Sequence, residues 1–353
     1  MRRITQLAVS VLVVTAAGCS RLPVPVPGPG ELTCRQVDSD STLSLTWIEA
    51  NDARSRAVLP SWCATVGPVV YDPRPAAAPP HAFNNTLVVI SWNVHVGAGD
   101  VDDLIRRLKR GEFTAGEPVT DFVLLLQEVH RRGHGVPPKL ARGFPVPHRI
   151  ERASRQHDDD VRAIAREHGL ALLYAPTMRN GESPIDPEDR GNAIVSTIAL
   201  RDAQVLELPL AHQRRVVPMA TIGGQTGDAP WSLRIASVHF DTALAISHGG
   251  PFDTRRRQAD AVIAALAPSA IPTLVGGDFN TWLGDREPAI AALRRAFPAT
   301  PKTTRGATWR GALGLRATLD HVFVRGAVQS VNVRRLPSRF GSDHYPLLAV
   351  IRF

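Results

Sequence analysis

Residues 273–281 read Thr-Leu-Val-Gly-Gly-Asp-Phe-Asn-Thr, and this stretch decides how the second part of the chain is interpreted. Its apolar, β-branched start predicts a buried strand that ends at Gly276. Gly276 and Gly277 would let the backbone approach a ligand closely, and Asp278 and Asn280 follow them directly. The same residues are also typical of a plain turn. Taken alone, the stretch leaves a turn and a ligand site open as alternatives.

Polar side chains follow apolar runs at six further places between residues 86 and 353. These places are Ser91-Trp92-Asn93-Val94-His95, Leu126-Gln127-Glu128-Val129, Gly191-Asn192-Ala193-Ile194-Val195-Ser196, Ser237-Val238-His239-Phe240-Asp241, Leu319-Asp320-His321-Val322-Phe323 and Gly341-Ser342-Asp343-His344-Tyr345-Pro346-Leu347. In α/β sheets, strand ends are where side chains converge on a ligand crevice. The recurrence favours one shared site over a set of unrelated turns.

From Asn84 onward, short β-branched runs alternate with helical patterns, which predicts a single α/β domain over residues 84–353. The expected strands are Thr86–Trp92, Asp121–Leu126, Leu170–Tyr174, Ala193–Ile198, Val216–Ile222, Ser232–His239, Thr273–Gly276, His321–Val324, Val328–Arg334 and Tyr345–Arg352. Helices are expected at Asp102–Lys109, Asp158–Glu167, Thr254–Ala265 and Glu287–Ala296.

Together the seven segments resemble the endonuclease/exonuclease/phosphatase superfamily, which includes pancreatic-type deoxyribonucleases, abasic-site endonucleases, neutral sphingomyelinases and inositol polyphosphate 5-phosphatases. The resemblance spans residues 86–353, with the motifs in the family's order. It implies a four-layer α/β sandwich, in which two mainly antiparallel or mixed β-sheets pack together with helices on their outer faces. It also implies divalent-metal-dependent hydrolysis of phosphate esters.

The resemblance implies that Glu128 is the principal metal ligand, that Asn93 assists at the same metal or orients the phosphate, and that Asp343 contributes to the site. Mg²⁺, or Mn²⁺ in its place, suits such oxygen ligands and keeps several waters. Asn192 is expected to contact the substrate or to support a residue that does. A solvated charge at a strand end is the alternative for Glu128, but this Glu follows a fully apolar run.

The resemblance also implies a role for each remaining motif. Asp278 would orient or deprotonate the attacking water, and Asn280 would hydrogen-bond the phosphate. His344 would touch a phosphate oxygen in the transition state, with Asp320 fixing its tautomer and keeping it protonated. His239 would donate to the phosphate or protonate the leaving oxygen. A structural histidine remains the alternative for His239.

The N-terminal part indicates export. Residues 1–18 combine two arginines with a short apolar run, as in a signal peptide, and Thr15-Ala16-Ala17-Gly18-Cys19 resembles a lipoprotein signal in which Cys19 becomes lipidated. A Pro-rich tether is expected over 19–30, and an appendage with its linker over 31–80. In an oxidising compartment the remaining pair, Cys34 and Cys63, predicts a disulfide, with two separate thiols as the alternative. The expected location is the cell envelope, anchored to the membrane by lipid.

The substrate is less constrained than the chemistry. A net charge of +8 suits an anionic partner, and the basic loops 131–132, 139–155 and 305–316, with Trp282 and Trp309, favour nucleic acid over phospholipid. A sphingomyelinase-like phospholipid phosphodiesterase, a phosphomonoesterase and a non-catalytic envelope binding lipoprotein remain alternatives. No aromatic hairpin suited to a bilayer is apparent, and a monomer is expected.

Overall fold

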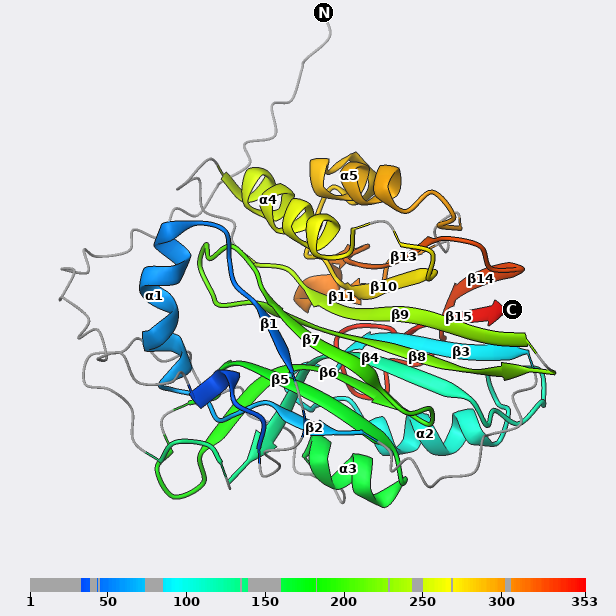
Figure 1. The fold of residues 1–353 in the computed structure, drawn as a ribbon, viewed down its shortest axis with the longest axis horizontal. Helices are drawn as coiled ribbons and strands as arrows, with labels where there is room; N and C mark the ends of the chain where they lie inside the picture. The colour runs from blue at the N-terminus through cyan, green and yellow to red at the C-terminus, as the bar shows by residue number, and fades with distance from the viewer. Residues whose placement is uncertain are drawn as a thin grey trace, which may run out of the picture.

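Two β-sheets pack face to face, and helices cover the outer side of each (Figure 1). The computed structural model describes residues 33–38, 43, 45–73, 85–133, 135–138, 160–181, 183–227, 229–242, 250–267, 269–301 and 306–353. The order of layers is helices, six-stranded sheet, seven-stranded sheet, helices. This arrangement confirms the four-layer α/β sandwich expected from the sequence.

One sheet has seven strands and includes those that end at Asn93 and contain Glu128. Its strands, in spatial order, are β14 (Ser330–Arg335), β15 (Leu347–Arg352), β3 (Thr86–Asn93), β4 (Phe122–Arg132), β6 (Glu188–Ser196), β5 (Ala171–Arg179) and β2 (Val70–Asp72). Neighbours are antiparallel except β3 and β4, which run parallel. Helices α2 (Val101–Lys109) and α3 (Val161–Glu167) lie beside this sheet, below it in Figure 1.

The other sheet has six strands and includes those that carry His239, Asp278 and Asp320. Its order is β1 (Thr46–Ile48), β7 (Arg201–Glu207), β8 (Val216–Thr226), β9 (Ala229–His239), β10 (Thr273–Asp278) and β13 (Asp320–Arg325). The pairs β1/β7 and β9/β10 are parallel, and the others are antiparallel. Helices α4 (Gly250–Ala265) and α5 (Pro288–Ala296) form the outer layer on this side.

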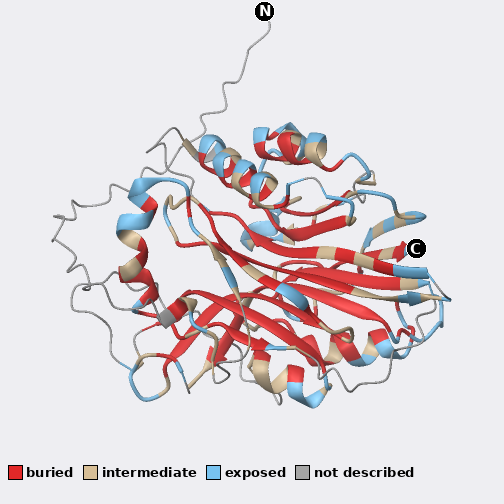
Figure 2. Ribbon diagram, in the orientation of Figure 1, coloured by how far each residue is buried: buried red, intermediate tan, exposed pale blue. Residues whose placement is uncertain are grey.

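Apolar side chains fill the space between the sheets, and Figure 2 shows the central strands almost entirely buried. Val89 and Leu125 from one sheet belong to the same cluster as Ile235 and Leu274 from the other. Two further clusters hold the helices, one under α2 and α3 and one under α4 and α5. Burial on both sheet faces explains why these strands read as continuous apolar runs instead of strict alternation.

All ten expected strands and all four expected helices have a counterpart in the structure, with shifted ends. The sequence interpretation missed β1, β2, β7, the helix α1 (Ala53–Cys63), the hairpin of β11 (Trp309–Arg310) and β12 (Arg316–Ala317), and the 3₁₀ turns η1 (Thr33–Arg35), η3 (Gly284–Arg286) and η4 (Ala312–Gly314). Most are only two or three residues long, so they carry no periodic signal. The strand β7 begins with two exposed charged residues, which hide its apolar end.

Residues 45–73 are built into both sheets. Strand β1 pairs with β7 in one sheet, and strand β2 pairs with β5 in the other. Gly67 donates its backbone N–H to Asp189 at 2.9 Å, and Asp189 also pairs with the buried Arg131. The expected disulfide between Cys34 and Cys63 is present, with Cα atoms 5.0 Å apart. This bridge fixes η1 against α1.

Several expectations fall outside the described residues. They are the signal peptide over 1–18, Cys19, the tether over 19–30 and the basic loop over 139–155. Among the described residues, no helix is both long and apolar enough to cross a membrane.

Loss of the disulfide is expected to destabilise the protein. Replacing Cys34 and Cys63 by Ser should lower the free energy of unfolding by about 3 to 4 kcal/mol, because the bridge closes a loop in the unfolded chain. Urea unfolding followed by Trp fluorescence measures this difference. A reductant should shift the midpoint of the wild type and leave that of the double variant unchanged. Equal midpoints for both proteins without reductant would contradict the expectation.

Candidate active site

Three neighbouring strands of the six-stranded sheet end in one row of functional side chains. Asp278, at the end of β10, is the register partner of His239 on β9 and of Asp320 on β13. His239 and Asp278 end their parallel strands, and Asp320 begins the antiparallel one, so all three lie at the same edge. Each is almost completely buried. The row explains why residues 39 and 42 positions apart in the chain, His239 to Asp278 and Asp278 to Asp320, lie in one place.

The seven-stranded sheet supplies Asn93 and Glu128 at the same edge. Asn93 ends β3 and is the register partner of Gln127 on β4. Its side-chain N–H donates to Asp278 Oδ2 at 3.0 Å, which ties the two sheets together. Its Oδ1 accepts from the backbone N–H of His95 at 2.9 Å, so the amide orientation is fixed from both ends.

A β-bulge in β4 places Glu128. The register of β4 shifts between Leu126 and Val129, and Glu128 has a φ of 56° in the left-handed region. The buried Gln127 before it donates to Ser237 Oγ at 3.0 Å, on the other sheet. That anchoring leaves the next residue to turn outwards, because a bulge re-aims the side chains around it. The Glu128 side chain is consequently 18% exposed, unlike the apolar run before it.

Tight local contacts hold His344 in the loop before β15. Its backbone carbonyl accepts from Trp92 Nε1 at 3.1 Å, and its N–H donates to Ser342 Oγ at 3.0 Å. Its Nδ1 lies 2.9 Å from Asp320 Oδ2, and its Nε2 lies 3.6 Å from Asp278 Oδ2. Burial alone would lower the pKa of His344, but the two carboxylates outweigh burial and raise it to about 10. His344 is therefore an imidazolium at neutral pH.

Asp278 is set up as a base. Its Oδ1 accepts from the backbone N–H of Asn280 at 2.9 Å, and its Oδ2 accepts from Asn93. Burial, with a contribution from Asp320, raises the pKa of Asp278 to about 7, against the lowering effect of His344. A carboxylate with a pKa near the working pH accepts a proton from water far better than an ordinary Asp.

His239 is a neutral donor in the same row. Arg215 donates from Nη1 to His239 Nδ1, 3.1 Å away, so the proton of the neutral ring lies on Nε2. That Nε2 lies 3.6 Å from Asp278 Oδ2 and 3.8 Å from Glu128 Oε1, and it makes no hydrogen bond within the described part of the chain. Burial and the charges of Arg215, His344 and Arg190 lower the pKa of His239 well below 6.5.

The comparisons with known proteins agree with this geometry. Residues 90–344 match the model of the Endonuclease/Exonuclease/phosphatase family. The chain belongs to this family. Its members are divalent-metal-dependent phosphoesterases that hydrolyse phosphate-ester substrates, and this chain carries acidic and His groups that could bind such a metal.

Individual relatives are distant. The chain is 36% identical over 99 residues to the UPF0294 protein VV2535 of Vibrio vulnificus, which covers 26% of this chain and 32% of that protein. It therefore matches about a third of the length of this curated relative. An endonuclease/exonuclease/phosphatase family protein from Leptotrichia buccalis has the same fold, with a TM-score of 0.50, 13% identity and coverage of 76% of this chain and 100% of that one. For the human Nocturnin catalytic domain with bound sulfate, the TM-score is 0.47 and the sequence identity is 17%. The match covers 77% of this chain and 96% of that one.

The residues of this family member fit a divalent cation at Glu128. Within the described residues its partly exposed carboxylate makes no hydrogen bond, and it lies 3.8 Å from Nε2 of the neutral His239. Asp343 contributes a second negative charge, because the charges and N–H groups of His95, His344 and Trp309 outweigh burial and lower its pKa to about 2. Carboxylate and amide oxygens are the donors that Mg²⁺ prefers, so Glu128, Asp343 and Asn93 would hold it.

Asp278, Asp320 and His344 also lie close enough together to share an ion. We interpret these three as the proton-handling group instead. A protonated imidazole has no lone pair for a metal, and Asp320 already binds Nδ1 of His344. Metal binding and proton transfer are thus assigned to two separate groups of side chains within the site.

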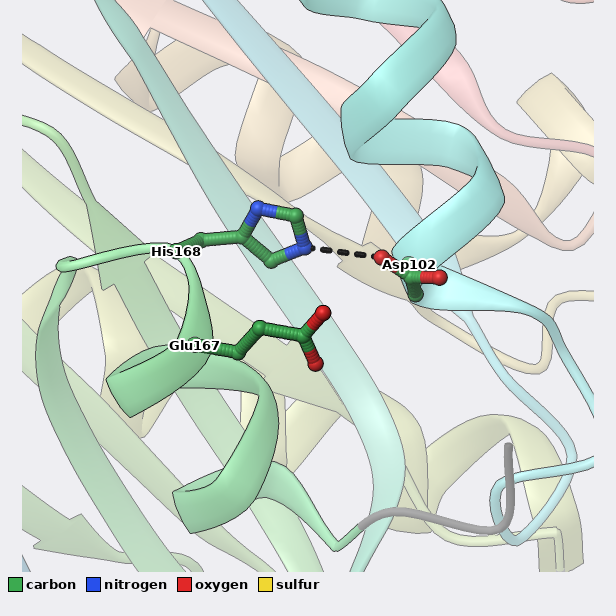
Figure 3. Close-up of side chains that lie close together, drawn as sticks. All are labelled: Asp102, Glu167 and His168. Atoms are coloured by element: carbon green, nitrogen blue, oxygen red, sulfur yellow. Dashed lines mark hydrogen bonds and ion pairs between the residues drawn. The ribbon is translucent and has the colours of Figure 1, made fainter.

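A second cluster of metal-type residues, Asp102, Glu167 and His168, lies between α2 and the end of α3 (Figure 3). His168 Nε2 lies 2.9 Å from Asp102 Oδ1, whereas the other Asp102 oxygen pairs with Arg106 at 2.7 Å. Lys109 Nζ lies 3.5 Å from the second nitrogen of His168. Two neighbouring cations disfavour a metal there, so the cluster is a tie between α2 and the end of α3.

Asn280 lies within the site, whereas the side chains of Asn192 and His321 make structural contacts. Asn280 lies beside Asp278 with a φ of 51°, and its side-chain N–H donates to the Phe240 carbonyl at 3.0 Å. Asn192 donates to the Val216 carbonyl on the opposite sheet at 2.8 Å, so it anchors the start of β8. His321 points away from the row and lies 3.1 Å from Thr281 Oγ1, as strand alternation predicts.

Sequence interpretation missed several supporting residues. Thr308 Oγ1 accepts from the backbone N–H of Asp320 at 3.0 Å, and Trp309 Nε1 donates to Asp343 Oδ2 at 2.9 Å. Arg190 and Arg215 lie near His239. Thr308 stands in a segment without a strand pattern, so only tertiary contacts identify it. Trp309 was expected from the sequence to stack on bases, and its contact with Asp343 appears only in the structure. For Arg190, its place directly before the Gly-Asn-Ala-Ile motif was an available signal.

Removing the Asp320 charge is expected to disable His344. The Asp320→Asn variant should lose about 100- to 10,000-fold in kcat, because the amide neither fixes the His344 ring nor stabilises its charge. Steady-state hydrolysis of bis-p-nitrophenyl phosphate, with thermal unfolding alongside, measures the effect. Asp285→Asn, at an exposed ion pair with Arg294, is the matched control and should retain wild-type turnover. Wild-type kcat in a folded Asp320→Asn protein would refute the assigned role.

Proposed function

We propose that this family member is a phosphodiesterase that cleaves nucleic acid strands with the help of Mg²⁺ or Mn²⁺. The observation that carries the proposal is the row of His239, Asp278 and Asp320 facing Asn93 and Glu128 across the two sheets. Each chemical task of phosphate-ester hydrolysis has a group in this arrangement. A hydrolase needs each of these side chains. A protein that only binds phosphate would not need Asp278 as a base or the Asp320–His344 pair.

The side chains divide the work of hydrolysis. Asp278 accepts the proton of the attacking water, and Asn93 and the Asn280 backbone hold its carboxylate in place. The imidazolium of His344 and the N–H of His239 donate to phosphate oxygens, where negative charge builds up in the transition state. A cation at Glu128 would neutralise charge on the phosphoryl group and on the leaving oxygen.

Two features support nucleic acid as the substrate. The net charge of +8 favours a polyanion. Trp282 and Trp309 form an edge-to-face pair with ring centroids 5.2 Å apart, and Trp282 is 41% exposed. Trp309 also binds Asp343, so the pair lies directly beside the candidate metal ligands. An exposed indole at this position offers a flat face on which a base can stack.

A phospholipid diester is the second candidate, and one observation favours it. The β11–β12 hairpin exposes Leu313 completely and Leu315 by 60%. Exposed aliphatic side chains next to a phosphodiesterase site suit the surface of a bilayer. The sequence alone did not indicate such a hairpin.

Parallel hydrolysis assays test the proposal. The purified chain from Ser20 onward is given bis-p-nitrophenyl phosphate, plasmid DNA, RNA and sphingomyelin, each with Mg²⁺, Mn²⁺ or a chelator. We expect cleavage of the model diester and of at least one nucleic acid, abolished by the chelator and by Asp278→Asn. Cleavage of sphingomyelin alone would support the phospholipid candidate. Turnover of none of them would favour a narrow phosphomonoesterase or a binding lipoprotein.

Metal binding can be tested separately from turnover. Glu128→Gln should weaken Mn²⁺ binding in calorimetry by at least about tenfold, because a neutral amide replaces the principal ligand. Asp285→Asn is again the control, since its carboxylate is exposed and remote from the site. Unchanged Mn²⁺ affinity in Glu128→Gln would exclude this residue as a ligand.

We also propose that the chain is exported and anchored to the cell envelope through a lipid on Cys19, as its N-terminal sequence indicates. In a bacterial host, the wild type should fractionate with membranes and incorporate labelled fatty acid. Cys19→Ser should remove the label and release the protein into the soluble fraction. Label retained by Cys19→Ser would place the modification elsewhere.

A further inference from the structure

Two buried arginines near His239 lack the partners that other buried arginines have. Arg190 is 8% exposed and Arg215 is 4% exposed. Neither makes an ion pair with a carboxylate of the described residues. Arg190 Nη1 and Arg215 Nε also find no hydrogen-bond partner in that part of the chain. The charges of Asp241, Glu128 and Asp278 act on Arg215, but none of the three forms a close ion pair with it. A buried N–H donor without a partner costs free energy, so these donors mark a place where an anion can bind.

The other buried arginines show what is missing. Arg131 pairs with Asp189, Arg214 pairs with Glu207, and Arg255 pairs with Glu287. Arg179 donates to three backbone carbonyls. The fold thus satisfies four buried guanidinium groups internally, and it leaves Arg190 and Arg215 incompletely satisfied.

Both arginines face the same space. Asn192 reaches the Val216 carbonyl on the other sheet, and Arg190 lies two residues before it on β6. Side chains two apart on a strand share a face, so Arg190 also points towards the six-stranded sheet. Arg215 directly precedes β8 on that sheet, and the charges of Arg190 and Arg215 act on each other and on His239.

The position of Arg215 is fixed on both sides. Asp241 Oδ2 accepts the backbone N–H groups of His212 and Gln213 at 2.8 and 2.9 Å. Asn192 holds the carbonyl of Val216 on the other side. Arg215 itself donates to Gln213 Oε1 at 2.9 Å and to His239 Nδ1. A side chain held in this way is pre-organised, which is what a binding site for a small anion requires.

Arg215 lies on the side of His239 that is opposite to Asp278 and Glu128. His239 turns Nε2 towards Asp278 and Glu128, and Arg215 binds the opposite ring nitrogen, Nδ1. Arg215 is therefore separated from Asp278 by the width of an imidazole ring. The reacting phosphate is already faced by the charge of His344 and by the metal ligands.

We infer that Arg190 and Arg215 bind a second phosphate of the same substrate, next to the phosphate that is hydrolysed. This inference rests on the proposed phosphodiesterase function and narrows it to substrates with neighbouring phosphates, as in a nucleic acid strand. The guanidinium group is suited to this task because its planar donors match phosphate oxygens. Arg190 and Arg215 thereby set specificity, and His239 lies between them and the reacting groups.

Matched chromogenic substrates test the inference. Thymidine 5′-(p-nitrophenyl phosphate) is compared with the same ester carrying a 3′-phosphate, and thymidine 3′-(p-nitrophenyl phosphate) with and without a 5′-phosphate covers the opposite polarity. For one of the two pairs, we expect the second phosphate to raise kcat/KM about 10- to 100-fold, as hydrogen bonds to charged groups do. In Arg190→Gln this ratio should fall to near one. The exposed Arg256→Gln, the matched control, should keep the wild-type ratio.

Several outcomes would overturn the inference. A wild-type ratio near one for both pairs would do so, as would an unchanged ratio in Arg190→Gln. An equal loss on both members of a pair would place Arg190 at the reacting phosphate instead. Stimulation of the plain ester by inorganic phosphate, with no effect of a substrate phosphate, would show a site for the free ion. If Arg190→Gln fails to fold in a thermal unfolding assay, Arg190→Met replaces it.

A binding measurement separates this inference from the proposed function. Calorimetry compares thymidine 3′,5′-bisphosphate with both thymidine monophosphates, in wild type and Arg190→Gln. Tighter binding of the bisphosphate, lost in the variant, would support the second phosphate site even if no diester is turned over. Equal binding of all three ligands by the wild type, together with normal diester turnover, would reject the site and leave the proposed function intact.

Discussion

The site depends on the contact between the two sheets at one edge, where Asn93 donates to Asp278 across a distance of 3.0 Å. Each sheet alone holds only part of the chemistry. The seven-stranded sheet brings Asn93 and Glu128, and the six-stranded sheet brings His239, Asp278 and Asp320. The apolar layer between the sheets fixes their relative position, because close-packed interiors do not slide. Core packing therefore determines the geometry of the site at its edge.

Electrostatics then gives the two histidines opposite roles. His344 touches Asp320 and faces Asp278, so it is held as a cation. His239 touches Arg215, so it is held as a neutral ring with its proton on Nε2. Two chemically identical side chains on either side of Asp278 thus present different charges to a phosphate. Because both rings are buried, the difference comes from the charges around them, carboxylates at His344 and arginines at His239.

The N-terminal segment is connected to the same edge through two adjacent arginines. Arg214 pairs with Glu207, and its Nη2 lies 3.7 Å from the Cys34 sulfur of the disulfide. Arg215, the next residue, binds His239. Strands β1 and β2 extend both sheets, so this segment is part of the framework around the site. A disulfide persists in an oxidising compartment, so this covalent brace is compatible with the proposed export.

The sequence by itself predicted the ten strands, the four helices and the disulfide, because apolar runs, the polar residues that end them and paired cysteines are local features. The sandwich of two sheets and the roles of Asp278 and Glu128 came from the resemblance of seven such segments, in order, to a known family. Only the tertiary structure decided which face each side chain takes and what it touches. The bulge at Glu128, the donation of Arg215 to His239 and the unpaired Nη1 of Arg190 all depend on contacts between distant segments. Burial and charge pairing act through space, so a linear pattern cannot specify them.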